Sequence, residues 1–244
     1  MTRRMQDQVV IISGASAGIG QACARALMRE GAKLVLMARR RERLEQLVAE
    51  ARQCDTEAAF VVGDARNEDV VRQTVELAKS TFGRIDVLIN NAGVGNYKKL
   101  VDTSAQEYDE MMDANMRTSF LFTRHAVPVM IEQRSGLVLL ISSMAGIYGF
   151  AGEAVYCATK FAQVGFAEGL DKELRPYGIK VGTINPGGVK TEFAMGQGRT
   201  EEAVAQSGML EAADVAQAVL FACTQPAGAR IIQIQMRCMA ESLT

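Results

Sequence analysis

Three side chains in the middle of the chain, Ser143, Tyr156 and Lys160, are of types that transfer protons. Tyr156 and Lys160 are four residues apart, so on a helix they share one face. Free tyrosine has a pKa of about 10, and a nearby ammonium lowers it by favouring the phenolate. Tyr156 can then exchange a proton with a carbonyl or alcohol oxygen that Ser143 hydrogen-bonds. The pair alone is weak evidence, because this spacing is common on solvated helical faces.

A glycine-rich segment near the N-terminus has the pattern of a phosphate site. The apolar run Val9–Ile12 leads into glycines spaced G-x-x-x-G-x-G and then into a helical pattern. Glycines let the backbone approach a pyrophosphate, and the free N–H groups and dipole of a helix start favour its charge. The alternative is a plain strand-to-helix turn, which needs one glycine rather than three. The expected nucleotide contacts are Gly14, Ser16, Gly18, Ile19 and Gly20.

Four arginines stand among residues 39–43, just after a second apolar run, Lys33–Met37. No acid lies between that run and Glu42. An NAD site usually offers an acid at this position, whereas an NADP site offers an arginine. Cations at a helix start oppose its dipole, and a bound 2′-phosphate would offset that cost. We therefore expect NADP(H), with Arg39 as the first and Arg40 as the second ligand of the 2′-phosphate. A solvated helix start is the alternative.

Short apolar runs that alternate with longer amphipathic segments must position these residues. This alternation predicts an α/β fold, a single-domain doubly wound Rossmann-type parallel sheet of about seven strands flanked by helices, over residues 1–244. The glycine-rich stretch 187–209 follows the sixth strand, where a substrate lid would lie. The expected strands are 9–12, 33–37, 58–62, 87–89, 137–141, 180–184 and 231–236, and the expected helices are 18–30, 40–53, 67–82, 104–132 with a break, 154–176 and 211–223.

Composition excludes several other classes of protein. The formal net charge is −1, which gives no global electrostatic attraction to nucleic acid or to an anionic membrane. Five cysteines without a C-x-x-C pair indicate reduced thiols in a cytoplasmic protein, and a single histidine makes a metal site unexpected. The charge-free stretch 135–152 is rich in Ser and Gly, so we expect a buried strand and a loop there rather than a membrane span.

Taken together, these segments resemble the short-chain dehydrogenase/reductase family. The resemblance covers residues 6–235, and six motifs stand in the family's order. They are Ser13–Gly20 for T-G-x-x-x-G-x-G, Asn90–Gly93 for N-N-A-G, the active-site Asn115, the active-site Ser143, Tyr156–Lys160 for Y-x-[AS]-[ST]-K, and Pro186–Thr191 for P-G-x-x-x-T.

The resemblance implies roles for individual residues. Tyr156 would be the general acid/base, and Lys160 would bind the nicotinamide ribose and lower the Tyr156 pKa. Ser143 would polarise the substrate carbonyl, and Asn115 would hold a water in a proton relay through Lys160. Besides Tyr156 and Lys160, the implied cofactor contacts are Asp64, Ala65, Asn91, Ala92, Gly93, Pro186, Gly187, Val189 and Thr191.

The resemblance also implies the reaction, an NADPH-dependent hydride transfer between nicotinamide and a carbonyl or alcohol. A 3-oxoacyl-thioester reductase is an alternative, but the chain lacks the V-D-G-G ending of typical members of that group. A cofactor-binding regulator without catalysis is a second alternative, although Asn115, Ser143, Tyr156 and Lys160 are all present. The expected substrate crevice takes residues from 94–98, 144–153 and 187–209. Few charged residues stand in these segments, which favours an apolar ketone or aldehyde as substrate. The family implies a homodimer or homotetramer.

Overall fold

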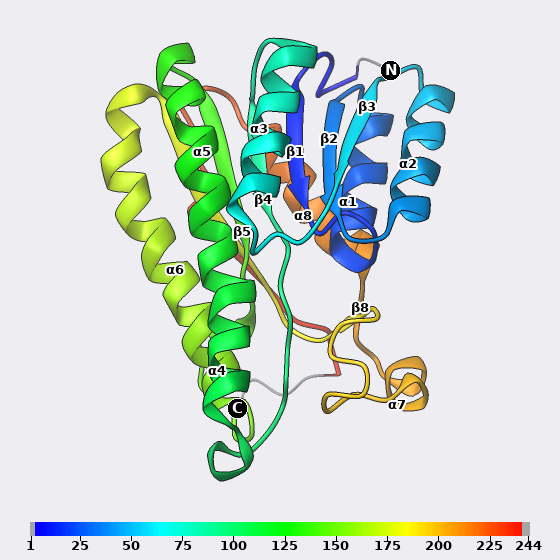
Figure 1. Ribbon diagram of the computed structural model, residues 1–244, viewed down its shortest axis with the longest axis vertical. Coiled ribbons are helices and arrows are strands. Elements are labelled where there is room, and N and C mark those ends of the chain that lie inside the picture. The colour runs from blue at the N-terminus through cyan, green and yellow to red at the C-terminus, as the bar shows by residue number, and fades with distance from the viewer. Residues whose placement is uncertain (1–2, 241–244) are drawn as a thin grey trace.

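Seven parallel strands form the centre of the computed structural model, which describes residues 3–240 (Figure 1). They lie in the order β3-β2-β1-β4-β5-β6-β9, so the direction of progression reverses between β1 and β4. At such a reversal a ligand crevice opens beyond the carboxyl ends of the strands. The strands are β1 (Val9–Ser13), β2 (Lys33–Ala38), β3 (Ala58–Val62), β4 (Val87–Asn90), β5 (Gly136–Ile141), β6 (Ile179–Pro186) and β9 (Gln233–Met236).

Helices cover both faces of this sheet (Figure 1). One face carries α1 (Gly18–Arg29), α2 (Arg41–Gln53) and α8 (Ala212–Cys223). The other carries α3 (Glu68–Phe82), α5 (Thr118–Gln133) and α6 (Ala154–Leu174). Smaller elements are α4 (Ala105–Met112), α7 (Glu201–Gln206), the strand pair β7 (Val189–Lys190) and β8 (Leu210–Glu211), and short turns of helix at Leu100–Asp102, Met144–Gly146 and Arg175–Tyr177.

The alternation of side chains along each strand produces two separate cores. On β1, Val10 and Ile12 pack beneath α1 and α8, whereas Val9 and Ile11 pack beneath α3 and α5. All four side chains are buried, as expected for a parallel strand covered on both faces. The run Val9–Ile12 is apolar throughout because helices cover both faces of β1. Its packing on both sides holds the carboxyl end of β1 in place.

The doubly wound sheet and the alternating helices confirm the fold predicted from the sequence. The break expected within residues 104–132 is a π-helical turn at Asp113–Arg117, which joins α4 to α5. The stretch 187–209 was expected to lack regular structure, and it contains β7 and α7. In residues 3–240, no helix combines the length and the apolar character needed to cross a bilayer.

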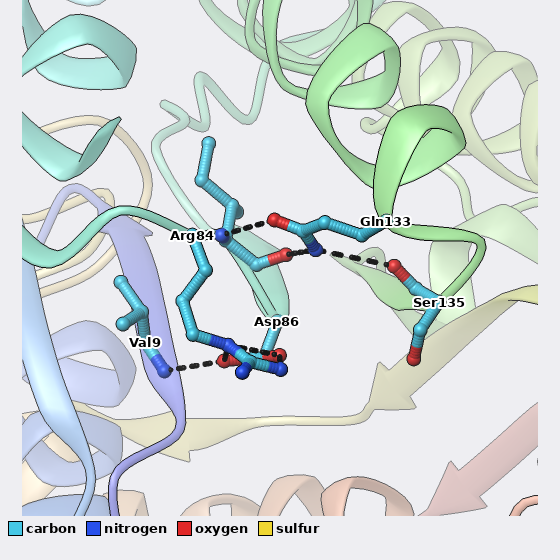
Figure 2. Close-up of polar contacts among 6 residues, drawn as sticks. Val9, Arg84, Asp86, Gln133 and Ser135 are labelled. Atoms are coloured by element: carbon cyan, nitrogen blue, oxygen red, sulfur yellow. Dashed lines mark hydrogen bonds and ion pairs between the residues drawn. The ribbon is translucent and has the colours of Figure 1, made fainter.

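Polar contacts fasten the amino-terminal edge of the sheet, at the end opposite the expected crevice (Figure 2). Asp86 accepts a hydrogen bond from the Val9 N–H at 2.8 Å and pairs with Arg84 at 2.7 Å. The Gln133 amide at the end of α5 bonds both backbone groups of Ile85, at 2.9 Å and 2.8 Å. These contacts connect β1, β4 and α5, so they set how the helix lies along the sheet.

We expect Gln133→Leu to lower the free energy of unfolding by about 1–3 kcal/mol, because both backbone groups of Ile85 lose their partner. Urea unfolding of the two proteins measures the difference. Gln106→Leu is the matched control, since the Gln106 amide lies on the exposed surface of α4 and bonds only Glu110. Its effect should stay within about 0.5 kcal/mol. If both variants lost the same free energy of unfolding, the stabilising role of the Gln133 contacts with Ile85 would be contradicted.

Candidate active site

The three glycines of the first loop lie where no side chain would fit. Gly14 and Gly18 have φ angles of +68° and +52°, in the left-handed region that favours glycine. A Cβ on Gly14 would lie 2.9 Å from Ala92 Cα, and one on Gly20 would lie 2.5 Å from Asn91 Nδ2 and from the Gly14 carbonyl oxygen. The loop therefore packs directly against the backbone that follows β4.

Ser13 holds these two segments together. Its buried hydroxyl accepts hydrogen bonds from the Asn91 and Ala92 N–H groups, both at 3.0 Å. The Asn91 amide returns bonds to the Ser13 and Gly14 carbonyls, at 2.9 Å and 3.1 Å. The hydroxyl does this work, which explains how serine can stand where the family pattern has threonine.

The amino-terminal end of α1 has the chemistry of an anion site. Ala17 precedes the helix and supplies no capping side chain, and the first turn contains no acid. The first N–H groups of a helix have no partner within it, so here they face the loop formed by Gly14–Gly18. A cradle that excludes side chains, beside unpaired N–H donors, fits the pyrophosphate of a dinucleotide.

The arginines after β2 reach this loop from the side. Arg40 Nε donates to Ser16 Oγ at 3.2 Å, and Arg43 Nη1 lies 3.4 Å from the Ser16 carbonyl oxygen. Both guanidinium groups also pair with Glu192, at 2.6 Å and 2.7 Å. Arg39 is exposed, and its charge helps to lower the pKa of Asp64. Of the two expected phosphate ligands, Arg40 contacts the loop, and so does Arg43, which the sequence analysis did not single out.

Asp64 and Ala65 follow β3 at the same edge of the sheet. The Asp64 carboxylate is held by Arg66, whose Nη2 lies 2.7 Å away, and this hydrogen bond lowers the pKa of Asp64. The acid expected to contact adenine is thus already oriented by its neighbour, on an exposed surface.

The chemistry-bearing side chains converge at the carboxyl ends of β4 and β5. Tyr156 and Lys160 lie on one face of α6, with Lys160 Nζ 5.7 Å from the centre of the Tyr156 ring. Ser143 follows β5, its presence lowers the pKa of the Tyr156 phenol, and its Oγ lies 3.4 Å from the Pro186 carbonyl oxygen. Tyr156 and Lys160 are both buried. The sheet thereby brings together three residues that the sequence separates.

Burial sets the protonation of this pair. It raises the pKa of the Tyr156 phenol well above its usual range, and the neighbouring Tyr97 adds to this. The hydrogen bond from Ser143 and the charge of Arg199 act in the opposite direction. Burial also lowers the pKa of Lys160 from 10.5 to about 7. Burial is thus the largest cause of the pKa shift in both groups.

Asn115 lies in the π-helical turn and is completely buried. Its side-chain amide bonds both backbone groups of Val94, at 2.7 Å and 3.0 Å, and donates to Thr159 Oγ1 at 2.9 Å. A Cβ on Gly93 would approach Asn115 Oδ1 to 2.8 Å. The Asn115 side chain therefore fixes the path of the segment that follows β4, beneath α6.

The segment after β6 closes over the loop and the tyrosine. Thr191 contacts Gly18, and the Gly187 N–H donates to the Met236 carbonyl at 2.7 Å. Val189 is buried in β7. Of the expected contacts in this motif, Thr191 thus borders the loop before α1.

Two aromatic rings pack against Tyr156. Tyr97 and Phe193 lie with their ring centres 5.5 Å and 5.9 Å from that of Tyr156. Arg199, also in the 187–209 stretch, lies over both of these rings, and its Nη1 donates to the Val189 carbonyl at 3.1 Å. Tyr97 was missed from the sequence, although it stands four residues after the N-N-A-G motif.

Comparison with known proteins gives the family. The sequence profile described as "short chain dehydrogenase" matches residues 8–202. This chain belongs to the short-chain dehydrogenase family. Like the relatives below, it is an oxidoreductase. An uncharacterized oxidoreductase of Staphylococcus aureus (strain USA300) is 36% identical over 96% of this chain and 98% of that protein. One of Staphylococcus epidermidis (strain ATCC 35984) is 32% identical with the same coverage.

Solved structures resemble this short-chain dehydrogenase along nearly its whole length. An alcohol dehydrogenase from the archaeon Thermococcus sibiricus, complexed with 5-hydroxy-NADP, has a TM-score of 0.88 at 28% identity, covering 97% of this chain and 99% of that one. A metagenomic short-chain oxidoreductase in complex with NADP has a TM-score of 0.83 at 30% identity, and the match covers 98% of this chain and 100% of that one. Levodione reductase has 0.87 at 30%, covering 95% and 96%.

The depressed pKa of Lys160 predicts a pH dependence of stability. Between pH 7 and 9 the unfolded chain binds a proton at Lys160 that the folded protein has largely released. The free energy of unfolding therefore gains, from this residue, up to about 1.4 kcal/mol for each pH unit of increase. Lys160→Met should lose that gain, so urea unfolding at pH 7, 8 and 9 should give a flatter profile. Parallel profiles for the two proteins would contradict the prediction.

Proposed function

We propose that this short-chain dehydrogenase is an NADPH-dependent oxidoreductase that transfers hydride between nicotinamide and a carbonyl or alcohol substrate. The observation that carries the proposal is the convergence of Ser143, Tyr156 and Lys160 at the sheet edge that also forms the glycine cradle. Two of the structural neighbours, complexed with NADP or 5-hydroxy-NADP, support the choice of cofactor.

In reduction, the bound cofactor supplies the hydride that the carbonyl carbon receives. Ser143 Oγ donates a hydrogen bond to the carbonyl oxygen and polarises it, and Tyr156 gives that oxygen its proton. The product is the alcohol, and Tyr156 is left to regain a proton. Lys160, as an ammonium, favours the phenolate that forms for the moment on Tyr156. Oxidation runs through the same contacts in reverse.

The cofactor contacts follow from the cradle. The loop Gly14–Gly20 would hold the pyrophosphate, with the N–H groups of Gly18, Ile19 and Gly20 as donors. The adenosine end would lie by Asp64 and Ala65, and the nicotinamide end by Asn91–Gly93 and the Pro186–Thr191 motif. Arg39, Arg40 and Arg43 would take the 2′-phosphate, to which guanidinium groups are well matched.

The substrate would enter beside Tyr156, where Tyr97 and Phe193 form an aromatic wall. This wall supports an apolar ketone or aldehyde as substrate. Because Phe193 belongs to the stretch 187–209, that stretch would act as the lid and move to admit it. Phe120 on α5 and Phe161 on α6 are exposed, which supports a homodimer or homotetramer that covers them. Light scattering on the purified protein tests the assembly, and a monomer would contradict it.

We expect Tyr156→Phe to lower kcat by about 100-fold or more, because the phenol supplies the proton to the product. NADPH consumption is measured over aldehydes, apolar ketones, diketones and 3-oxoesters, with wild type and variant side by side. The affinity for NADPH should change little. Turnover that survives in the variant would contradict the mechanism, and NADPH binding without turnover of any member would favour a regulator. A preference for 3-oxoacyl thioesters in a second panel would favour the 3-oxoacyl-thioester reductase.

We expect Arg39→Ala and Arg40→Ala to weaken NADPH binding by about tenfold or more, since each removes a charge-assisted contact. NADH, which lacks the 2′-phosphate, should bind both variants nearly as it binds wild type. The change in the cofactor's own nicotinamide fluorescence on binding measures the affinities. Arg41→Ala is the control, because Arg41 pairs with Glu45 along α2. Equal losses for NADPH and NADH would contradict the assignment.

A further inference from the structure

Gln163 is a buried polar residue on α6 that none of the roles above uses. It lies one turn beyond Lys160 and is completely buried. A buried carboxamide is costly unless each of its polar atoms finds a partner. Those of Gln163 do: Oε1 accepts from Lys160 Nζ at 3.0 Å, and Nε2 donates to the Asn115 carbonyl at 3.0 Å and to Ser119 Oγ at 2.9 Å.

The chemistry of the partners fixes the orientation of this amide. In its charged form Lys160 only donates hydrogen bonds, and a backbone carbonyl only accepts them. With Lys160 charged, the amide oxygen therefore faces Lys160 and the amide nitrogen faces Asn115. Ser119 Oγ donates to the same Asn115 carbonyl at 2.9 Å and completes the set. If the amide were flipped, its hydrogen bonds with Lys160 Nζ and with the Asn115 carbonyl would both be lost. The side chain is therefore a directed bridge from the ammonium on α6 to the π-helical turn.

The bridge holds Lys160 from the interior side. Lys160 Nζ donates to the Ile141 carbonyl at 3.1 Å and to Gln163 Oε1 at 3.0 Å, which leaves one of its three N–H groups for the cleft. In the part of the chain described, no acid forms an ion pair with Lys160. The positive charge is thus stabilised by two neutral carbonyl dipoles, one from the backbone of β5 and one from Gln163.

We propose that Gln163 is a positioning residue, which holds the Lys160 ammonium beneath Tyr156 through a direct amide bridge to the Asn115 carbonyl and tunes its affinity for a proton. The proposal rests on the proposed function, in which that ammonium assists Tyr156. Gln163 thereby connects Lys160 directly to the carbonyl of Asn115.

The titratable and charged groups near Lys160 are few. Tyr156 on the same helix is its titratable neighbour, and Tyr97, Glu153 and Arg199 act on Tyr156 from the cleft side. From β5 and the π-helical turn it meets neutral groups, the Ile141 carbonyl and, through Gln163, that of Asn115. A change at position 163 therefore acts on Lys160 directly.

Two substitutions of similar size test the proposal in opposite directions. Gln163→Glu places a carboxylate beside the ammonium and should raise the pKa of Lys160 by about one unit or more. Gln163→Met removes the acceptor and should lower that pKa, because the charged form loses a hydrogen bond. The pKa is read from the NMR titration of protein labelled with ¹³C at the lysine ε-carbons, without cofactor. The Lys160 signal is the one absent from Lys160→Arg.

Kinetics provide the second readout. The protonated ammonium assists Tyr156, so the alkaline limb of kcat/KM for carbonyl reduction should move to higher pH in Gln163→Glu and to lower pH in Gln163→Met. Gln133→Leu is the matched control, since it removes a two-way amide contact at the opposite edge of the sheet. It should lower stability while leaving both the Lys160 titration and the pH profile unchanged.

The outcomes separate this proposal from the proposed function. An unchanged Lys160 pKa in either folded variant overturns the role of Gln163, even if the protein reduces carbonyls well. Shifted pKa values in a protein that reduces no carbonyl support the bridge and overturn the proposed function instead. Because the two variants act in opposite directions, one that folds is sufficient for the test.

Discussion

A buried ammonium without an acidic partner is the constraint on which the active-site end of this molecule depends. Removing the Lys160 charge from water is unfavourable, and no acid among residues 3–240 forms an ion pair with it to offset that cost. Oriented carbonyl groups must do so, and they come from β5 and from Gln163. Gln163 in turn requires the Asn115 carbonyl, which the π-helical turn presents toward α6. The distortion between α4 and α5 is therefore part of how the lysine is held.

A second constraint acts at the reversal of the strand order. The loop after β1 and the segment after β4 come so close that a Cβ at Gly14 or Gly20 would collide with the backbone or amide of the other segment. Ser13 and Asn91 fasten that approach with reciprocal hydrogen bonds. The same glycines leave the start of α1 open to an anion. One close approach thus both joins the two halves of the sheet and shapes the phosphate cradle.

The fold and the outline of the site follow from patterns that are visible along the chain. Apolar runs such as 9–12 and 137–141 are local signals, because a strand covered on both faces needs an uninterrupted apolar stretch. The spacing of Tyr156 and Lys160 is also a local signal, as is the spacing of the glycines. Both can be recognised in the sequence without the structure. The stop of α1, which ends at Arg29 just before Gly31 with its φ angle of +87°, is a local signal too.

Which of these groups come into contact, and what their pKa values are, depends on how the elements pack in three dimensions. The run of arginines after β2 is a local signal, but only the turn into α2 brings Arg40 and Arg43 into contact with Ser16. The sequence predicted a phenol activated by Lys160, whereas burial dominates the pKa of both groups. Desolvation and hydrogen-bond direction depend on everything packed around an atom. The spacing of residues along the chain does not show them. The role of Gln163 therefore follows only from the packing of α6 against the π-helical turn.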